Sequence, residues 1–331
     1  MIGQPRFWQK RFGLGLFLLP LSLLWWLGGR LRTMRTTPFK SNLPVICIGN
    51  LTVGGTGKTP TALLIAQLLQ NAGWHPAILS RGYGGTQTGP CWVDAHAHTA
   101  RDVGDEPLLL SRQLSVCVSR NRKEGARFIE DSQQHDVIIM DDGLQNPQLY
   151  KDIIFGVFDG AVGIGNGFLM PAGPMREGFS SAKTKLDAVV INGTDDTNLS
   201  SLLPADTPVF RAHLVPDSSS ANLTGHAFYA FAGIGRPERF FDSLETLGAD
   251  LRGKRAFADH HPYNSIDLST IAAAADEADA KLITTEKDWQ RLPVDWQDRI
   301  ATLPVSLTLQ ERDENALMAF LQKRLKHVLS S

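Results

Sequence analysis

Short apolar segments rich in β-branched residues alternate, along the first two thirds of the chain, with longer segments whose apolar residues recur at helical spacing. Short runs of this kind predict buried strands, and the helical spacing predicts helices that pack against them. The predicted strands are 44–48, 75–80, 115–119, 137–142, 153–158 and 188–191, and the predicted helices are 62–69, 108–114 and 123–134. Because strands and helices alternate, we expect an α/β fold with a mostly parallel sheet flanked by helices.

A second, shorter α/β pattern follows a polar stretch at Ser218–Ser220. It predicts strands at 228–234 and 282–285 and helices at 237–247, 266–278 and 314–328. A chain of 331 residues is long enough for two domains. We therefore expect an N-terminal segment, a larger domain and a smaller C-terminal α/β domain, with the bounds 1–40, 41–215 and 216–331.

The N-terminal segment holds 18 uncharged, mostly apolar residues, 12–29. Cations bracket this run: Arg6, Lys10 and Arg11 precede it, and Arg30, Arg32 and Arg35 follow it. A helix of this length reaches about 27 Å, barely the hydrocarbon thickness of a bilayer, and Pro20 weakens it further. No small-residue cleavage site follows, which argues against a secretory signal peptide. The flanking cations favour a monotopic or peripheral helix on the cytoplasmic leaflet over a spanning helix or a buried core helix.

Charge is distributed unevenly along the chain. The first 93 residues contain nine Lys or Arg and no Asp or Glu, so they carry +9 and the remaining 238 residues carry −10. Such a basic part suits an anionic membrane surface or a phosphorylated substrate. Nucleic-acid binding is disfavoured, because the cations surround an apolar segment instead of alternating with aromatic residues that could stack on bases. The three cysteines lack C-x-x-C spacing, so neither a zinc ribbon nor a disulfide framework is expected.

A glycine-rich loop, GNLTVGGTGKT at 49–59, joins the first predicted strand to the first predicted helix. This order of strand, loop and helix is typical of a phosphate-binding P-loop. In such a loop backbone N–H groups converge on phosphate oxygens, Lys58 neutralises the β and γ phosphates, and the Thr59 hydroxyl binds Mg²⁺. Thr52 stands where the general pattern has glycine. We expect the nucleotide to contact Thr52, Val53, Gly54, Gly55, Thr56, Gly57, Lys58 and Thr59.

Two carboxylates, Asp141 and Asp142, end the predicted strand at 137–142. P-loop proteins hold their Mg²⁺ with acidic residues in this position, so we expect these two to be metal ligands. No glutamate follows that would polarise a water molecule. This favours transfer of the phosphoryl group to another acceptor over hydrolysis.

Other charged residues lie in turns, where two interpretations stay open. Asp105 is either a helix N-cap or a third carboxylate that serves as metal ligand or general base. Arg81 follows the strand at 75–80, at an edge where ligands collect, and it either binds phosphate or is solvated. Arg176 and Glu177 lie in a rigid loop rich in Pro and Gly that suits nucleotide or substrate contacts.

The turn Asp259-His260-His261 lies in the smaller predicted domain. Two adjacent histidines without further ligands do not make a metal site. They are either solvated, or Asp259 tunes the imidazole of His260 for proton transfer.

In combination these motifs closely resemble the tetraacyldisaccharide 4'-kinase family, enzymes of lipid A synthesis in Gram-negative bacteria. The motifs are IGNLTVGGTGKTP at 48–60, SRGYG at 80–84, GDEP at 104–107, DDGLQ at 141–145, PAGP at 171–174 with Arg176-Glu177, Asp259-His260, and TEKD at 285–288. The resemblance spans nearly the whole chain, and the P-loop of the family, too, has this form with threonine at position 52.

The resemblance implies transfer of the γ-phosphoryl group of ATP to the 4'-hydroxyl of an acylated glucosamine disaccharide 1-phosphate, giving lipid IVA. It places the enzyme on the cytoplasmic side of the inner membrane, with ATP and Mg²⁺ as cofactors and no obligate protein partner. Asp105 and His260 would deprotonate the acceptor, and His261 is the less favoured candidate for that role. The implied catalytic set is Lys58, Asp105, Asp142 and His260.

Two other classes of function remain as alternatives. A membrane-associated P-loop NTPase that acts as a switch or assembly factor would hydrolyse nucleotide without a lipid acceptor. A non-catalytic membrane-binding module would keep the nucleotide for stability alone, so that Lys58→Ala would lower the melting temperature and abolish no reaction.

Overall fold

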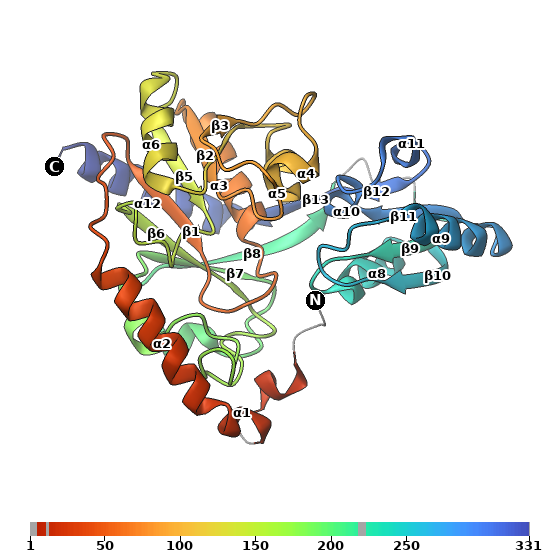
Figure 1. Ribbon diagram of the computed structural model, residues 1–331, viewed down its shortest axis with the longest axis horizontal. Helices are drawn as coiled ribbons and strands as arrows, with labels where there is room; N and C mark the ends of the chain where they lie inside the picture. Colours follow the sequence, from red (N-terminus) through yellow and green to blue (C-terminus); the bar gives the residue numbers. More distant parts are fainter. Residues whose placement is uncertain (1–4, 11–12, 218–222, 331) are drawn as a thin grey trace.

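A nine-stranded sheet forms the centre of the larger unit (Figure 1) in this computed structural model, which describes residues 5–10, 13–217 and 223–330. The strand order is β13-β8-β7-β6-β1-β5-β2-β4-β3. All neighbours are parallel except at the edges, where β3 is antiparallel to β4 and β13 to β8. The bounds are β1 Val45–Gly49, β2 Pro76–Ser80, β3 Cys91–Trp92, β4 Ser115–Val118, β5 Val137–Asp141, β6 Ile153–Asp159, β7 Ala188–Asn192, β8 Val209–Pro216 and β13 Val305–Leu309. The expected mostly parallel α/β fold is confirmed.

Helices cover both faces of this sheet, which explains why its central strands are continuous apolar runs. On one face α3 (Lys58–Asn71) and α12 (Glu311–Leu329) enclose the largest buried cluster with β1, β5 and β6. On the other face lie α6 (Arg122–Asp131) and α7 (Phe179–Ala182). Shorter helices complete the unit: α4 Ala100–Val103, α5 Asp105–Leu110, η2 Lys183–Lys185 and η3 Leu199–Leu202.

The smaller unit is a four-stranded parallel sheet in the order β10-β9-β11-β12, seen at the right of Figure 1. Its strands are β9 Ala227–Ala232, β10 Asp250–Ala256, β11 Lys281–Thr285 and β12 Ala301–Leu303. The helix α8 (Pro237–Thr246) packs on one face and α9 (Ser265–Glu277) on the other. Two short helices, α10 (Glu286–Trp289) and α11 (Val294–Gln297), follow β11. The predicted linker at Ser218–Ser220 lies outside the described residues.

The last strand, β13, and the last helix, α12, belong to the larger unit, whereas the predicted domain 216–331 includes them. β13 pairs with β8 at the edge of the large sheet, and α12 lies on that sheet (Figure 1). Leu317, Leu321 and Leu325 recur every four residues on α12 and are fully buried in the core of the larger unit. A periodic helix shows which face is buried but not against which sheet, so this return is a tertiary result.

The buried face of α12 yields a stability prediction. We expect Leu321→Ala to lower the free energy of unfolding by about 3 kcal/mol, because it removes buried methyl groups and leaves a cavity. Leu329→Ala is the control, since that side chain on the same helix is 61% exposed; its effect is expected to stay within about 0.5 kcal/mol. Urea unfolding followed by circular dichroism measures both, and equal effects would contradict the packing of α12.

The N-terminal segment contains η1 (Arg6–Gln9), α1 (Leu14–Phe17) and α2 (Leu19–Met34), with α2 along one side of the larger unit (Figure 1). Ser22 is the buried residue of α2, and the large apolar side chains of this helix are exposed. The alternative of a buried core helix is therefore wrong. Among the described residues no helix combines the length and apolar character needed to cross a bilayer. Arg11 and Phe12 of the predicted segment lie outside those residues.

Candidate active site

The P-loop lies between β1 and the N-terminus of α3, as expected. Gly57 caps the helix with a φ of +92°, and a Cβ atom there would lie 2.7 Å from Nδ2 of Asn192, so the position requires glycine. Inside the loop, the Asn50 side-chain amide donates to Oγ1 of Thr56 at 3.2 Å. Lys58 opens α3 at the helix end where backbone N–H groups are free to bind anions. The loop thus has the geometry of a phosphate cradle.

Asp141 lies at the carboxyl end of β5, in register with Ile48 of β1 and beside the P-loop. The Thr59 hydroxyl donates to its Oδ2 at 3.4 Å, whereas its Oδ1 is buried and accepts no hydrogen bond from the described residues. Burial, and then the charges of Glu106 and Asp142, raise the pKa of Asp141 to about 7. A buried carboxylate oxygen without a donor fits a cation.

Thr59 and Asp141 suit Mg²⁺ better than a metal ion that is coordinated by protein side chains alone. No group of three or more His, Cys, Asp or Glu side chains within the described ranges is arranged to hold a metal ion. Mg²⁺ usually takes one or two carboxylates and completes its shell with phosphate oxygens and water. The Thr59 hydroxyl and the unpaired oxygen of Asp141 match this pattern.

Asp142 connects the P-loop lysine with the loop that carries Arg176. Its φ is +48°, in the left-handed region, and its Oδ1 accepts from Nη1 of Arg176 at 2.9 Å. Nζ of Lys58 lies 3.9 Å from the same oxygen. Gln145 extends the cluster, because its amide donates to Oε1 of Glu177 at 2.9 Å. Arg176 therefore lies near Lys58 of the P-loop, and Gln145 joins it to Glu177.

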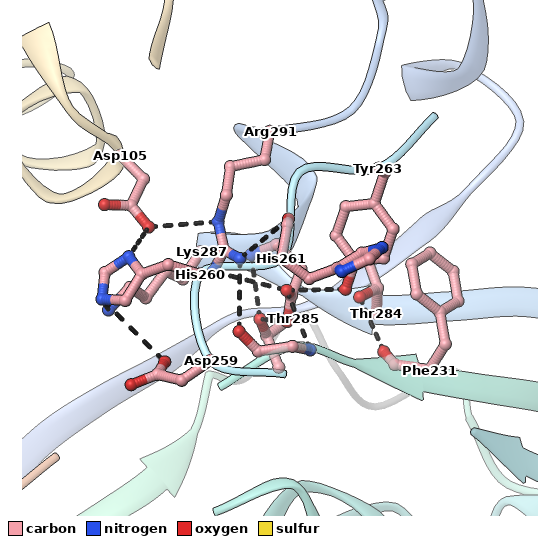
Figure 2. A network of polar contacts seen from close by, with 12 residues as sticks. Asp105, Phe231, Asp259, His260, His261, Tyr263, Thr284, Thr285, Lys287 and Arg291 are labelled. Carbon is pink, nitrogen blue, oxygen red and sulfur yellow. Dashed lines mark hydrogen bonds and ion pairs between the residues drawn. The ribbon is translucent and has the colours of Figure 1, made fainter. Parts of the chain in front are cut away.

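The smaller unit brings His260 to Asp105, 155 positions away in the chain (Figure 2). Nδ1 of His260 lies 3.1 Å from Oδ2 of Asp105, which is 5% exposed. Gly104, and not Asp105, is the N-cap of α5; Asp105 is the first helical residue, and its Oδ1 accepts from the backbone N–H of Glu106 at 3.0 Å. His260, like Asp142, has a positive φ, here 58°. Such backbone conformations cluster at functional sites.

His261 faces away from this pair. Its Nε2 lies 2.9 Å from Oδ2 of Asp267, and its ring stacks on Phe257 with ring centroids 4.7 Å apart. Both contacts are within the smaller unit. The geometry therefore places His260, and not His261, against Asp105.

Three charged residues of this network were missed as site residues by the sequence reasoning: Glu106, Lys287 and Arg291. Nζ of Lys287 donates to Oε1 of Glu106 at 2.8 Å, and Nε of Arg291 lies 3.1 Å from Oδ2 of Asp105. The motif at 285–288 was the available signal, but its spacing alone favours a capped helix start over a functional role. Thr285 does cap α10, through a bond from the Asp288 amide to its Oγ1 at 3.0 Å.

Comparison with known proteins identifies the family. The model of the family described as tetraacyldisaccharide-1-P 4'-kinase matches residues 14–326. The chain belongs to this family. Curated relatives named tetraacyldisaccharide 4'-kinase include one from Paramagnetospirillum magneticum, 44% identical over 92% of this chain and 93% of its own length, and one from Bradyrhizobium sp. (strain ORS 278), 41% identical over 99% of both.

A solved structure shares the fold. It is described as the "apo" form of LpxK from Aquifex aeolicus in complex with ATP, and it is 26% identical to this chain with a TM-score of 0.75. The match covers 95% of this chain and 100% of the other. The resemblance to the tetraacyldisaccharide 4'-kinase family that the sequence motifs indicated is confirmed.

The remaining candidate site residue of this tetraacyldisaccharide 4'-kinase family member is Arg81. Arg81 is exposed at the carboxyl end of β2 and pairs with no carboxylate of the described residues. Burial, and to a smaller extent the charge of Arg81, lower the pKa of the buried Arg122 to about 10, whereas the charges of Asp141 and Asp142 act to raise it.

The Asp105 carboxylate predicts a pH-dependent stability. Burial by itself would raise its pKa, but the bond from His260 and the charges of Lys287 and Arg291 lower it from 3.8 to about 2. A carboxyl with a lowered folded pKa stabilises the fold above its unfolded pKa and loses this effect as the pH falls through the folded pKa. We expect Asp105→Asn to lose about 2 kcal/mol of pH-dependent stability, present above about pH 4 and vanishing toward about pH 2.

Urea unfolding of wild type and Asp105→Asn at about pH 7, 5 and 3 measures this difference. A difference that stays constant down to about pH 3, or grows there, would show that Asp105 is not held ionised in the fold.

Proposed function

We propose that this protein transfers the γ-phosphoryl group of ATP to the 4'-hydroxyl of tetraacyldisaccharide 1-phosphate, forming lipid IVA in lipid A synthesis. The proposal rests on two clusters: a P-loop with Lys58, Thr59 and Asp141, and the Asp105–His260 pair from two units. The clusters are neighbours, because the charge of Glu106, the residue after Asp105, affects the pKa of Asp141. The first suits a nucleotide and the second suits a hydroxyl acceptor. Membership of the family, and the ATP complex of the Aquifex aeolicus protein, support it.

Mg²⁺ is proposed as the cofactor, held by Thr59 and Asp141 with Asp142 close by. When bound it would neutralise charge on the transferring phosphoryl group. Lys58 would bind the phosphates from the N-terminus of α3, and Arg176 would hold Asp142 in place through their 2.9 Å ion pair. Glu177 and Arg81 are proposed to contact nucleotide or acceptor.

His260 is proposed to take the proton of the acceptor hydroxyl on Nε2. Its Nδ1 is engaged by the Asp105 carboxylate, which orients the ring and stabilises the imidazolium that forms. With a pKa of about 2, Asp105 is itself a weak base near neutral pH. Asp105 therefore acts through His260 in this scheme.

We propose that α2 holds the enzyme on the cytoplasmic face of the inner membrane of a Gram-negative bacterium. Its apolar side chains point outward over most of the helix; the exposed ones are Leu19, Leu21, Leu23, Leu24, Trp25, Trp26, Leu27 and Leu31. The cations Arg30, Arg32 and Arg35 follow at its C-terminal end. An exposed apolar helix with adjacent cations fits an interface of acyl chains and anionic headgroups. An acylated acceptor would lie in the same interface.

The test is ATP-dependent phosphorylation of tetraacyldisaccharide 1-phosphate in detergent micelles with Mg²⁺. Wild type is expected to form the 4'-phosphorylated product, and Asp105→Ala and His260→Ala to lose it while still binding ATP. Folded wild type that binds ATP and yields no product would remove the assignment. ADP release without the lipid, at the rate seen with it, would instead favour an NTPase switch.

A further inference from the structure

Lys287, at the start of the short helix α10, lies beside His260 (Figure 2). Its Nζ donates to Oε1 of Glu106 at 2.8 Å and lies 3.3 Å from Nε2 of His260. Nε2 is the ring nitrogen that Asp105 leaves free. An ammonium group therefore lies beside the ring nitrogen that receives the proton in the proposed function.

The hydrogen-bonding capacity of the two neighbours selects one form of the ring. An ammonium group only donates, so Nε2 beside it must present its lone pair; an ionised carboxylate only accepts, so Nδ1 beside Asp105 must carry the hydrogen. Both neighbours thus favour the same neutral tautomer of His260. The two neighbours have opposite effects on protonation of the ring, because the carboxylate favours the protonated form and the ammonium disfavours it.

We propose that Lys287 is a positioning residue that, together with Asp105, selects the tautomer of His260 with the hydrogen on Nδ1 and the lone pair on Nε2, and that gives up its place at Nε2 to the acceptor hydroxyl. This rests on the proposed kinase function. In the reaction the hydroxyl proton moves to Nε2, the hydroxyl oxygen forms a bond to the γ-phosphorus, and ADP leaves with the electron pair of the broken P–O bond. The imidazolium then returns its proton to solvent.

The surroundings keep Lys287 charged and in place. Burial acts to lower the pKa of Lys287, but the carboxylates of Glu106 and Asp105 raise it above its ordinary value. Glu106 holds the ammonium by a direct hydrogen bond, so Lys287 keeps a partner in the site when the acceptor hydroxyl takes its place at Nε2. The charged and aromatic groups that face the ring of His260 are Asp105, Asp259, Lys287 and the ring of Tyr83, with Arg291 bound to Asp105 and Glu106 bound to Lys287.

Removing the ammonium has a defined effect on the pH profile. Without it His260 protonates more readily, so the acid limb of kcat/KM is expected to move to higher pH by about one unit in Lys287→Met. Lys287→Arg keeps the charge and is expected to retain the wild-type profile. Lys281→Met is the matched control, because Lys281 lies exposed on β11 of the same unit. It is expected to change nothing.

A variant of Glu106 tests the same inference, because its acid limb is expected to shift in the opposite direction. In Glu106→Gln the charge of Lys287 is no longer balanced, so protonation of His260 becomes harder and the acid limb is expected to move to lower pH. A structural defect alone would not reverse the direction between the two variants. This second variant also keeps the proposal testable if Lys287→Met fails to fold, which thermal melting would reveal.

Titration of the His260 imidazole by ¹⁵N NMR reads the same shifts without activity, with His260→Asn used to assign the signals. The wild-type ring is expected as the neutral Nδ1–H form at pH values above its titration. Equal titration of His260 in wild type and in the folded variants Lys287→Met or Glu106→Gln would overturn the inference. Wild type without kinase activity would defeat the proposed function, while the NMR shifts would still decide the role of Lys287.

Discussion

Replacing Asp105 or His260 by alanine is expected to lower kcat by about 10³-fold, and replacing both is expected to cost little more than either alone. General acid–base catalysis contributes about 10² to 10⁴-fold, which sets the size of the single effects. The two side chains share one hydrogen bond of 3.1 Å, so each variant already disables the unit. Groups that act as a unit give non-additive losses. Initial rates of lipid phosphorylation at saturating ATP measure all three variants.

His261→Ala is the matched control for this double-mutant experiment. His261 is the neighbouring residue, but it bonds to Asp267 and stacks on Phe257. Its kcat is expected to stay within about threefold of wild type, because a substitution away from the reacting atoms changes stability more than rate. Losses that multiply in the double variant, or a larger loss in His261→Ala than in His260→Ala, would contradict the pair.

Lys58→Met is expected to lower kcat by about 10²- to 10³-fold, the usual cost of removing one preorganised group that stabilises charge developing in the transition state. The variant is expected to fold, because the one ion pair of Lys58 with the described residues is a long contact with Asp142, 3.9 Å from Nζ to Oδ1. Phosphorylation rates and ATP affinity are measured together with the melting temperature. ATP affinity is expected to fall as well, because the lysine binds phosphate in the ground state too.

Lys323→Met gives the control for Lys58→Met, since Lys323 is an exposed lysine on α12. Its rate and ATP affinity are expected to equal those of wild type. If Lys58→Met lowered the melting temperature but left the rate unchanged, the protein would be a module that keeps a nucleotide for stability, and the kinase assignment would be removed.

The strands of the large sheet were predictable where both of their faces are buried. β1, β2, β5 and β7 are buried at every position and read as continuous apolar runs. The strands β3, β8, β10, β12 and β13 were missed. Of these, β10 alternates exposed and half-buried residues, and β8 carries exposed residues along much of its length. A strand that gains its stability from pairing at an edge or in a small sheet has little apolar signal of its own.

Within the site, residues that local sequence order places together were predicted, and residues that only tertiary contacts bring together were missed. The P-loop and the pair at 141–142 follow from local order, since a strand, a glycine-rich turn and a helix start place them at one edge of the sheet. Glu106, Lys287 and Arg291 each resemble ordinary surface charges in the sequence. Only when α5 and α10 meet do they become a network around His260.

By itself the sequence determined the α/β class, the phosphate cradle, the apolar N-terminal helix and the family, because each depends on residues that are neighbours in the chain or on motifs in a set order. Tertiary structure decided which histidine meets Asp105, that α12 returns to the large sheet, and that an ammonium stands beside the proposed base. These contacts join residues far apart in the chain, and their formation depends on the packing of two units, which no local pattern encodes.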